Sequence, residues 1–145
     1  MEIRFFTKEV YQESPFHFHD QMEILIIMSE GDSFYIRNKI YPLSRGSIFI
    51  LNSSDIHRSV AKPRSIYQFY SIRFYPEEIQ GISTENFDLI RCFRNHEKFN
   101  HMVRLNIDQL DHLLKLINKI EYYLATDCSA SGKEIFAKTL LAEVL

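Results

Sequence analysis

The stretch that decides the fold runs from His17 to Met28 and reads HFHDQMEILIIM. Its second half, which starts at Ile24, is a continuous apolar run rich in β-branched residues. Such a run is typical of a strand that is covered on both faces. Its first half is polar and carries two histidines and Glu23. The stretch therefore predicts a buried strand that starts next to a cluster of ionisable side chains.

Short strands separated by turn residues extend outward from this stretch. Glu30-Gly31-Asp32 ends the first strand, and Asn38-Lys39 is expected to form a tight turn because Asn tolerates a positive φ. Pro42 falls inside a predicted strand, so it is expected at a sheet edge or a bulge. Strands spaced by turn signals every 8–12 residues or so, at roughly regular intervals, indicate a sandwich or a barrel. The expected strands lie around residues 3–5 and at 24–28, 33–37, 40–43, 47–51, 66–75 and 101–105.

The period of the apolar residues becomes helical at Asn106. One apolar stripe follows the segment 106–125, and Asn106 with Gln109 resembles a capping box at a helix start. Residues 126–132 are expected to link this helix to a second amphipathic helix, which begins near Ile135. The sequence therefore predicts two helices after the strands.

These patterns divide the chain into two parts. Residues 1–105 form the predicted barrel, with a short helix expected around 85–93, and residues 106–145 form the helical segment. The second helix reaches Leu145 without a capping residue. We therefore expect that further chain follows it.

The composition is that of a globular protein. Of 145 residues, 46% are apolar and 25% are charged, so the chain can bury enough apolar surface to offset the entropy of ordering. The chain has 17 basic and 19 acidic residues, whereas a domain that binds DNA phosphates normally has a basic excess. The first residues lack the apolar core of a signal peptide, and Cys92 and Cys128 are expected to be reduced thiols. We therefore expect a cytoplasmic protein whose own residues do not bind DNA.

The side chains best suited to chemistry are His17, His19, Glu23 and His57. In an unbroken strand, residues two or four positions apart share a face, so the first three would point to the same side. His57 follows a further predicted strand at a spacing that can return it to the same interior. Three imidazoles and a carboxylate are good ligands for a transition metal such as Fe, Mn, Ni or Zn. With open coordination positions, such a site could support oxygenase or isomerase chemistry.

The same four side chains also suit a metal-free pocket. A neutral histidine donates with one ring nitrogen and accepts with the other, so the group can form a hydrogen-bond network or bind the hydroxyl groups of a sugar. Tyr35, Tyr70 or Phe69 would then stack on the ligand. Arg37 and Arg73 could meet an anionic ligand, and the alternative is that both are exposed strand arginines. The residues leave the metal site and the metal-free pocket open.

Other kinds of active site find no support in the sequence. The chain has four glycines and contains no glycine-rich phosphate loop, no G-x-S-x-G nucleophile motif and no Cys/His pair at a catalytic spacing. The remaining histidines, His96, His101 and His112, have no ligand-like spacing and are expected on the surface or on helices. Phosphate-loop nucleotide binding and serine or cysteine hydrolysis are therefore not predicted.

Two segments resemble the motifs of the cupin family. The pattern His17-x-His19-x3-Glu23 is similar to the first motif, and residues 46–57, GSIFILNSSDIH, are similar to the second. Longer stretches resemble the N-terminal domain of AraC/XylS-type transcriptional regulators: HFHDQMEILIIMSEG, YPLSRGSIFILNSSDIH and YSIRF, followed by two predicted helices. This resemblance covers nearly the whole chain.

The resemblance implies a mainly β fold, namely a cupin-like double-stranded β-helix barrel followed by two α-helices. The barrel would bind a small effector such as a carbohydrate, and an N-terminal arm, residues 1–14, would fold over the pocket. The helix at 106–125 would pack against its twin in a homodimer. DNA would be bound only through a helix-turn-helix domain that is not in this chain.

The first helix has a wider apolar surface than one neighbour needs. Leu113, Leu116, Ile120 and Tyr123 extend it beyond one face, which favours a second contact surface, so these four residues are the predicted dimer contacts. The leading hypothesis is the effector-sensing and dimerisation domain of a transcriptional regulator, which is not an enzyme and needs no cofactor. The alternative is a small metal-dependent cupin enzyme, a dioxygenase or an isomerase, with the four histidine and glutamate residues as ligands.

Overall fold

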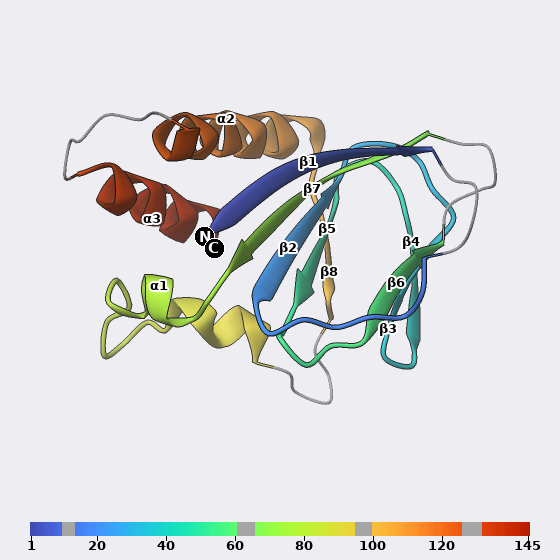
Figure 1. Cartoon of the computed structure of the whole chain (residues 1–145), viewed down its shortest axis with the longest axis horizontal. Coiled ribbons are helices and arrows are strands. Elements are labelled where there is room, and N and C mark those ends of the chain that lie inside the picture. The colour runs from blue at the N-terminus through green and yellow to red at the C-terminus, as the bar shows by residue number, and fades with distance from the viewer. Residues whose placement is uncertain (10–13, 61–65, 95–99, 126–131) are drawn as a thin grey trace.

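The structure is a computed structural model, and it describes residues 1–9, 14–60, 66–94, 100–125 and 132–145. In the described residues, eight strands precede two long helices (Figure 1). In chain order the elements are β1 (Glu2–Glu9), β2 (Met22–Ile27), β3 (Ser33–Ile36), β4 (Lys39–Pro42), β5 (Ser47–Leu51), β6 (His57–Val60), β7 (Ile66–Phe74), α1 (Glu77–Gln80), the 3-10 helix η1 (Leu89–Phe93), β8 (Met102–Arg104), α2 (Ile107–Ala125) and α3 (Lys133–Val144).

The strands form two antiparallel sheets. The five-stranded sheet has the order β1-β7-β2-β5-β8, and the three-stranded sheet has the order β4-β3-β6. The smaller sheet faces one side of the larger sheet, and helices α2 and α3 lie on the other side (Figure 1). The predicted cupin-type β-barrel followed by helices is therefore confirmed.

Strand β2 is covered on both faces, as its sequence predicts. All six of its residues are buried. Ile24 and Ile26 join the core between the large sheet and the helices, whereas Leu25 and Ile27 join the core inside the barrel. Because each side chain of this size stabilises a fold by about 1.5–3 kcal/mol when buried, this strand ties the two cores together.

The hairpin of β3 and β4 turns one residue earlier than expected. Ile36 pairs with Lys39, so the two turn residues are Arg37 and Asn38. Arg37 adopts a φ of 53°, the left-handed conformation that two-residue hairpin turns require. Pro42 lies in β4, an edge strand of the smaller sheet, as predicted from its missing backbone donor.

The start of α2 carries the predicted capping box. The backbone N–H of Asn106 donates to Oε1 of Gln109 at 3.0 Å, and the backbone N–H of Gln109 donates to Oδ1 of Asn106 at 2.9 Å. These two bonds satisfy backbone donors that the first helical turn leaves without partners. They explain why the helix begins directly after β8.

Three of the four predicted dimer contacts lie inside the chain. Leu113, Leu116 and Ile120 are 6%, 4% and 0% exposed, and α3 packs against α2. Tyr123 is half-buried and stacks on Phe136 of α3, with ring centroids 5.3 Å apart. This corrects the expectation that the four residues form an exposed surface, because the second helix of the same chain occupies much of the widened stripe.

Several segments differ from the sequence prediction. Strand β6 and helix α1 were not expected, and the helix expected around 85–93 is the shorter 3-10 helix η1. The first nine residues are not an arm over the pocket, because β1 pairs with β7 along its whole length. The rest of the expected arm at 10–13, together with His96 and Cys128, lies outside the described residues.

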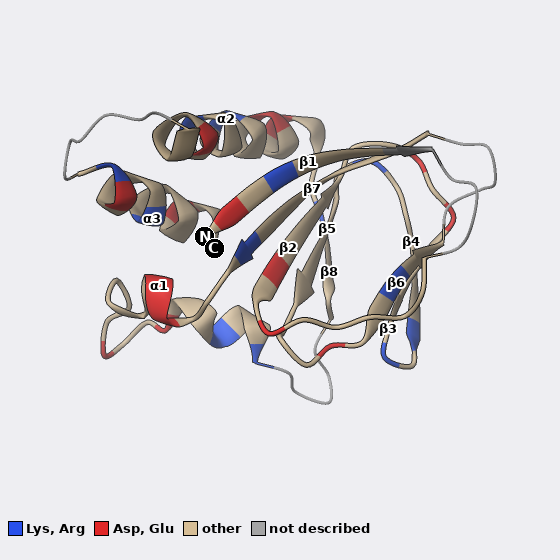
Figure 2. Cartoon of the chain, viewed as in Figure 1, with Lys and Arg blue, Asp and Glu red and all other residues tan. Residues whose placement is uncertain are grey.

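The charges are spread over the molecule. In Figure 2, basic and acidic residues are interspersed on α2, on α3 and among the strands, as expected from a net charge of −2. Cys92 is a half-buried free thiol. Within the described ranges, neither long helix combines the length and the apolar character that crossing a membrane requires.

Candidate functional site

The predicted polar cluster forms at the entrance to β2. The strand begins at Met22 and the chain bends just before it, so His17 and His19 lie outside the strand. The backbone N–H groups of His17 and His57 each donate to the carbonyl oxygen of the other, at 3.1 and 2.9 Å. The histidines therefore converge through this bridge between sequence-distant segments and not through the strand alternation that we expected.

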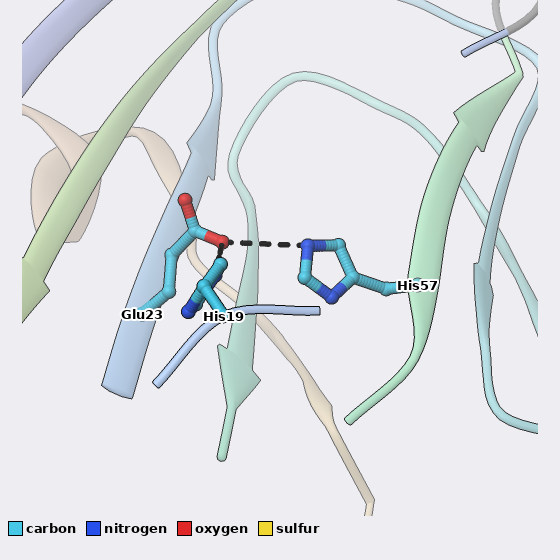
Figure 3. Close-up of side chains that lie close together, drawn as sticks. All are labelled: His19, Glu23 and His57. Carbon is cyan, nitrogen blue, oxygen red and sulfur yellow. Dashed lines mark hydrogen bonds and ion pairs between the residues drawn. The ribbon is translucent and has the colours of Figure 1, made fainter. Parts of the chain in front are cut away.

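Glu23 is the centre of the cluster and is 1% exposed. Its Oε2 accepts a hydrogen bond from His19 Nε2 at 2.9 Å and lies 3.5 Å from His57 Nε2 (Figure 3). Its Oε1 accepts from Arg73 Nε at 2.9 Å and from the hydroxyl of Ser71. One buried carboxylate thus joins β2, β6, β7 and the segment before β2.

The cluster fixes the charges of its members. Burial raises the pKa of Glu23, but hydrogen bonds from His19 and Ser71 and the charge of Arg73 outweigh burial and lower it from 4.5 to about 2. Burial lowers the pKa of His57 from 6.5 to about 4, although its backbone hydrogen bond and the charge of Glu23 act in the opposite direction. At neutral pH, Glu23 is therefore a carboxylate and His57 is a neutral imidazole.

A cavity of about 70 Å³ lies beside the cluster. Burial, followed by the charge of Glu23, raises the pKa of the Tyr67 hydroxyl in its wall, so this group stays protonated. Pockets for drug-sized ligands measure about 300–1,000 Å³, so this conformation holds only a few atoms. The polar lining residues are Ser14, His17, Glu23, His57, Ser59 and Arg73, and the other lining residues are Phe6, Leu25, Phe34, Tyr67 and Phe69.

Of the three aromatic residues predicted to stack on a ligand, only Phe69 lines the cavity. Tyr70, its neighbour on β7, points to the opposite face of the sheet and contacts Phe5, with ring centroids 4.7 Å apart. Tyr35 lies beside the Arg58 guanidinium, whose central carbon is 4.9 Å from its ring centroid. This corrects the assignment of Tyr35 and Tyr70 to the cavity wall, because a shift of one residue along a strand reverses the face.

Two partners of Glu23 were missed or misread in the sequence. Arg73 was weighed as an anion contact or an exposed arginine, and Ser71 was not considered. Both alternate with the buried apolar residues Ile72 and Phe74 along β7, and this period of two was the available signal. Their partner lies about fifty positions earlier in the chain, so the pairing itself could not be read locally.

A second buried polar group, Asp55, lies in the segment that leads into β6 and His57. Asp55 is fully buried and accepts from Arg37 Nε at 2.6 Å. His101 is 4% exposed, and its Nδ1 donates to the carbonyl oxygen of Ile50 at 2.9 Å. The expectation of a surface position is therefore wrong for His101, whereas His112 on α2 is exposed as predicted.

Among the described residues, His19, Glu23 and His57 form the group that could hold a metal ion, with ligand atoms within 4.8 Å of one another. The fourth predicted ligand, His17, is not in this group. The spacing suits a transition metal, but the charges do not. Glu23 Oε1 is already paired with Arg73, and its Oε2 accepts from His19. A divalent cation would add positive charge beside a guanidinium, so we derive no chemical step through a metal.

Comparisons with known proteins agree with a regulatory domain that binds a ligand. Residues 3–145 match the family described as the AraC-like ligand binding domain. The HTH-type transcriptional activator RhaR of Mannheimia succiniciproducens is 24% identical over 107 residues, which cover 74% of this chain and 36% of that protein. The chain thus spans about a third of the length of this curated relative.

Solved structures show the same fold. Wild-type ToxT from Vibrio cholerae strain SCE256, bound to an unsaturated fatty acid, matches with a TM-score of 0.63 and 12% identity, over 99% of this chain and 52% of that chain. The AraC-like transcriptional activator CuxR matches with a TM-score of 0.52 and 11% identity, over 86% of this chain and 42% of that chain. Because the family match extends over nearly every residue, the chain belongs to the AraC-like ligand binding domain family.

Proposed function

We propose that this chain is the effector-sensing and dimerisation domain of an AraC-type DNA-binding transcriptional regulator. Its family and its coverage of about a third of the RhaR relative support this proposal. A helix-turn-helix domain elsewhere in such a regulator would bind DNA, which agrees with the net charge of −2 and the interspersed charges of this chain. A regulator of this kind would act in the cytoplasm, where bacterial DNA lies.

The observation that carries the proposal is the cavity inside the barrel, whose lining contains both polar groups and aromatic rings. This combination is typical of small-molecule sites, in which apolar walls bind and a few polar groups orient the ligand. A small polar effector, with carbohydrates as the first class to screen, would bind there. A sugar would require the cavity to widen beyond about 70 Å³, and the ligand would favour the widened arrangement only by binding it more tightly.

A thermal-shift screen with two matched variants tests the proposal. Ser59 faces the cavity, as does its cross-strand partner Phe34. Ser33 precedes Phe34 on the same sheet, so its side chain points to the opposite face. A true effector at 100 times its Kd stabilises the fold by about 2.7 kcal/mol and raises the Tm by several degrees. Ser59→Phe should abolish this shift, and Ser33→Phe should preserve it. Equal shifts in both variants would place the binding site outside the barrel.

Dimerisation would use the exposed aromatic and aliphatic residues where α2 ends and α3 begins. Tyr122 on α2 is 65% exposed and Phe136 on α3 is 56% exposed. In sedimentation experiments, Phe136→Ser should shift the chain towards monomer, whereas Ile40→Ser, at another exposed apolar position, should not. A monomeric parent chain would rule out this part of the proposal.

A metal-dependent cupin enzyme is the second candidate, because the ligand atoms of His19, Glu23 and His57 lie within 4.8 Å of one another. It predicts a stoichiometric transition metal in the purified chain, and loss of that metal in His19→Ala. Elemental analysis of both proteins distinguishes the candidates. The regulator proposal expects a metal content well below one ion per chain and the same Tm with and without a chelator.

A further inference from the structure

Arg37 has a backbone conformation that is unfavourable for its residue type. Among the described residues, it is the one non-glycine residue with a positive φ, which is 53°. A positive φ brings Cβ close to the backbone, so glycine or asparagine usually occupies such a position and other residues strain it. Strain of this kind persists where the surrounding structure offsets it. The side chain of Arg37 should therefore make a contact that glycine could not.

This side chain pairs with a buried carboxylate. Nε of Arg37 donates to Oδ1 of Asp55 at 2.6 Å, and the Asp55 side chain is fully buried whereas that of Arg37 is 47% exposed. Oδ2 of Asp55 accepts from the backbone N–H of Asn52 at 2.9 Å and lies 3.7 Å from His101 Nδ1. A buried carboxylate that loses its cationic partner is strongly destabilised, because the protein interior solvates a charge poorly. Arg37 thus stabilises the buried position of Asp55.

The backbone of the same arginine contacts the next residue of that segment. The N–H of Arg37 donates to the carbonyl oxygen of Ile56 at 2.7 Å. The turn between β3 and β4 is therefore attached to the residues before β6 by one backbone bond and one ion pair. A substitution that removes only the side chain leaves the backbone bond in place, so the effect of the ion pair can be isolated.

Asp55 in turn orients the His57 imidazole. The backbone carbonyl oxygen of Asp55 lies 2.8 Å from His57 Nδ1. A carbonyl oxygen only accepts hydrogen bonds, so Nδ1 carries the hydrogen. The ring carries one such hydrogen at neutral pH, because burial lowers the pKa of His57 to about 4. Nε2, which lies 3.5 Å from Glu23 Oε2, is then without a hydrogen (Figure 3).

The other tautomer of His57 has a partner of its own. With its hydrogen on Nε2, the ring would donate to the carboxylate of Glu23, and hydrogen bonds to an ionised acceptor are stronger than those to a carbonyl. The contact with the Asp55 carbonyl opposes this change. The tautomer of His57 therefore reports whether Asp55 is in place.

We propose that Arg37 is a positioning residue of the cavity, which acts through Asp55 to hold the His57 imidazole with its hydrogen on Nδ1. The three residues connect a half-exposed guanidinium in the turn between β3 and β4 to an imidazole that is 2% exposed and lines the cavity. Glycine would relieve the strained turn, but it has no group to pair with Asp55. The inference rests on the proposed function only in assigning the cavity to effector sensing.

The test compares two substitutions of Arg37 with one of its neighbour. Arg37→Gly relaxes the turn and removes the ion pair, and Arg37→Gln keeps most of the side-chain length and removes the charge. Asn38→Gly changes the other turn residue and is the matched control. Two-bond 1H–15N spectra of the histidine-labelled chain at neutral pH give the ratio of the two His57 tautomers.

Both Arg37 variants should shift this ratio towards the Nε2–H tautomer by at least about tenfold, which corresponds to about 1.4 kcal/mol. Asn38→Gly should leave the ratio unchanged. A purely structural role of Arg37 would lower the Tm and not move the ratio, so an unchanged ratio in either folded Arg37 variant overturns the inference. An equal shift in Asn38→Gly also overturns it. The wild-type spectrum is decisive by itself if neither variant folds, because an Nε2–H tautomer there contradicts the proposed orientation.

The spectra need no ligand, so this inference and the proposed function can fail separately. A shifted ratio supports the role of Arg37 even if the thermal-shift screen finds no compound. An unchanged ratio, together with a thermal shift that Ser59→Phe abolishes, would overturn the role of Arg37 and leave effector sensing in place.

Discussion

Glu23 is the side chain at which the pH dependence of stability should concentrate. Its pKa is about 2 in the folded chain, against an ordinary value of 4.5. A carboxyl group whose folded pKa is lowered stabilises the fold above its unfolded pKa, and this contribution is lost as the pH falls towards the folded pKa. Since one pKa unit corresponds to about 1.4 kcal/mol, the full contribution is about 3 kcal/mol, of which about 2 kcal/mol should be lost between roughly pH 6 and pH 3.

The substitution Glu23→Gln keeps the size of the side chain and removes its charge. At pH 7 the variant should be less stable by a few kcal/mol, because Arg73 and His19 would be left beside a neutral amide in a buried site. Urea unfolding followed by circular dichroism at several pH values measures the gap between the two proteins. The gap should narrow by about 2 kcal/mol between roughly pH 6 and pH 3.

Two comparisons make this test specific. His57 titrates in both proteins, and its lowered pKa also makes both less stable as the pH falls. Because the charge of Glu23 raises the pKa of His57, the difference between the two proteins reports Glu23 together with its coupling to His57. Glu85→Gln, at an exposed carboxylate, should reproduce the wild-type pH dependence. A gap that stays constant down to roughly pH 3 would refute the charged, hydrogen-bonded Glu23 from which the site has been built.

Three further expectations follow from burial and backbone geometry. Phe49→Ala removes a fully buried ring and should lower the free energy of unfolding by about 3–5 kcal/mol. Phe18→Ala, at a ring that is 68% exposed, should change it by less than about 0.5 kcal/mol. Similar losses for the two variants in a urea titration would contradict this expectation. Gly46 has a φ of 82°, and an added Cβ would lie 3.2 Å from a backbone carbonyl oxygen, so Gly46→Ala should cost about 1–2 kcal/mol and lower the Tm. An unchanged Tm would argue against this backbone conformation. In calorimetric titrations, Phe69→Leu should weaken binding of a cavity ligand several-fold and Tyr70→Phe should not alter its Kd; the reverse result would mean that β7 has the other register.

The parts of the fold that the sequence predicts well are those set by neighbouring residues. The β-branched run of β2 predicts a strand buried on both faces, and the Asn106–Gln109 pair predicts the start of α2. Strand β6, HRSV, was missed because four residues without apolar alternation carry no strand signal. The faces of Tyr35 and Tyr70 were misassigned because alternation gives a period but does not say which face is inside.

The sequence predicted which residues form the candidate site better than it predicted how they are arranged. His19, Glu23 and His57 do meet, but the backbone bridge of His17 to His57 brings them together, and no local pattern encodes a bridge across forty residues. The same limit applies to α2. Its wide apolar stripe indicates two packing partners, and the sequence could not say that one of them is α3 of the same chain.

The pKa values of the cluster bear on one kind of chemistry, proton transfer by Glu23 or His57. A general acid or base works best when its pKa lies near the operating pH. Glu23, at about 2, and His57, at about 4, both lie well below neutrality, so each keeps one protonation state under ordinary conditions. A group that does not exchange protons is a poor catalyst of proton transfer, but it is a good fixed acceptor for a ligand.

Glu23 and His57 belong to opposite sheets, and α2 and α3 pack on the outer face of the sheet that carries Glu23. A ligand bound between Glu23 and His57 would therefore contact both sheets, including the one that packs against α2 and α3.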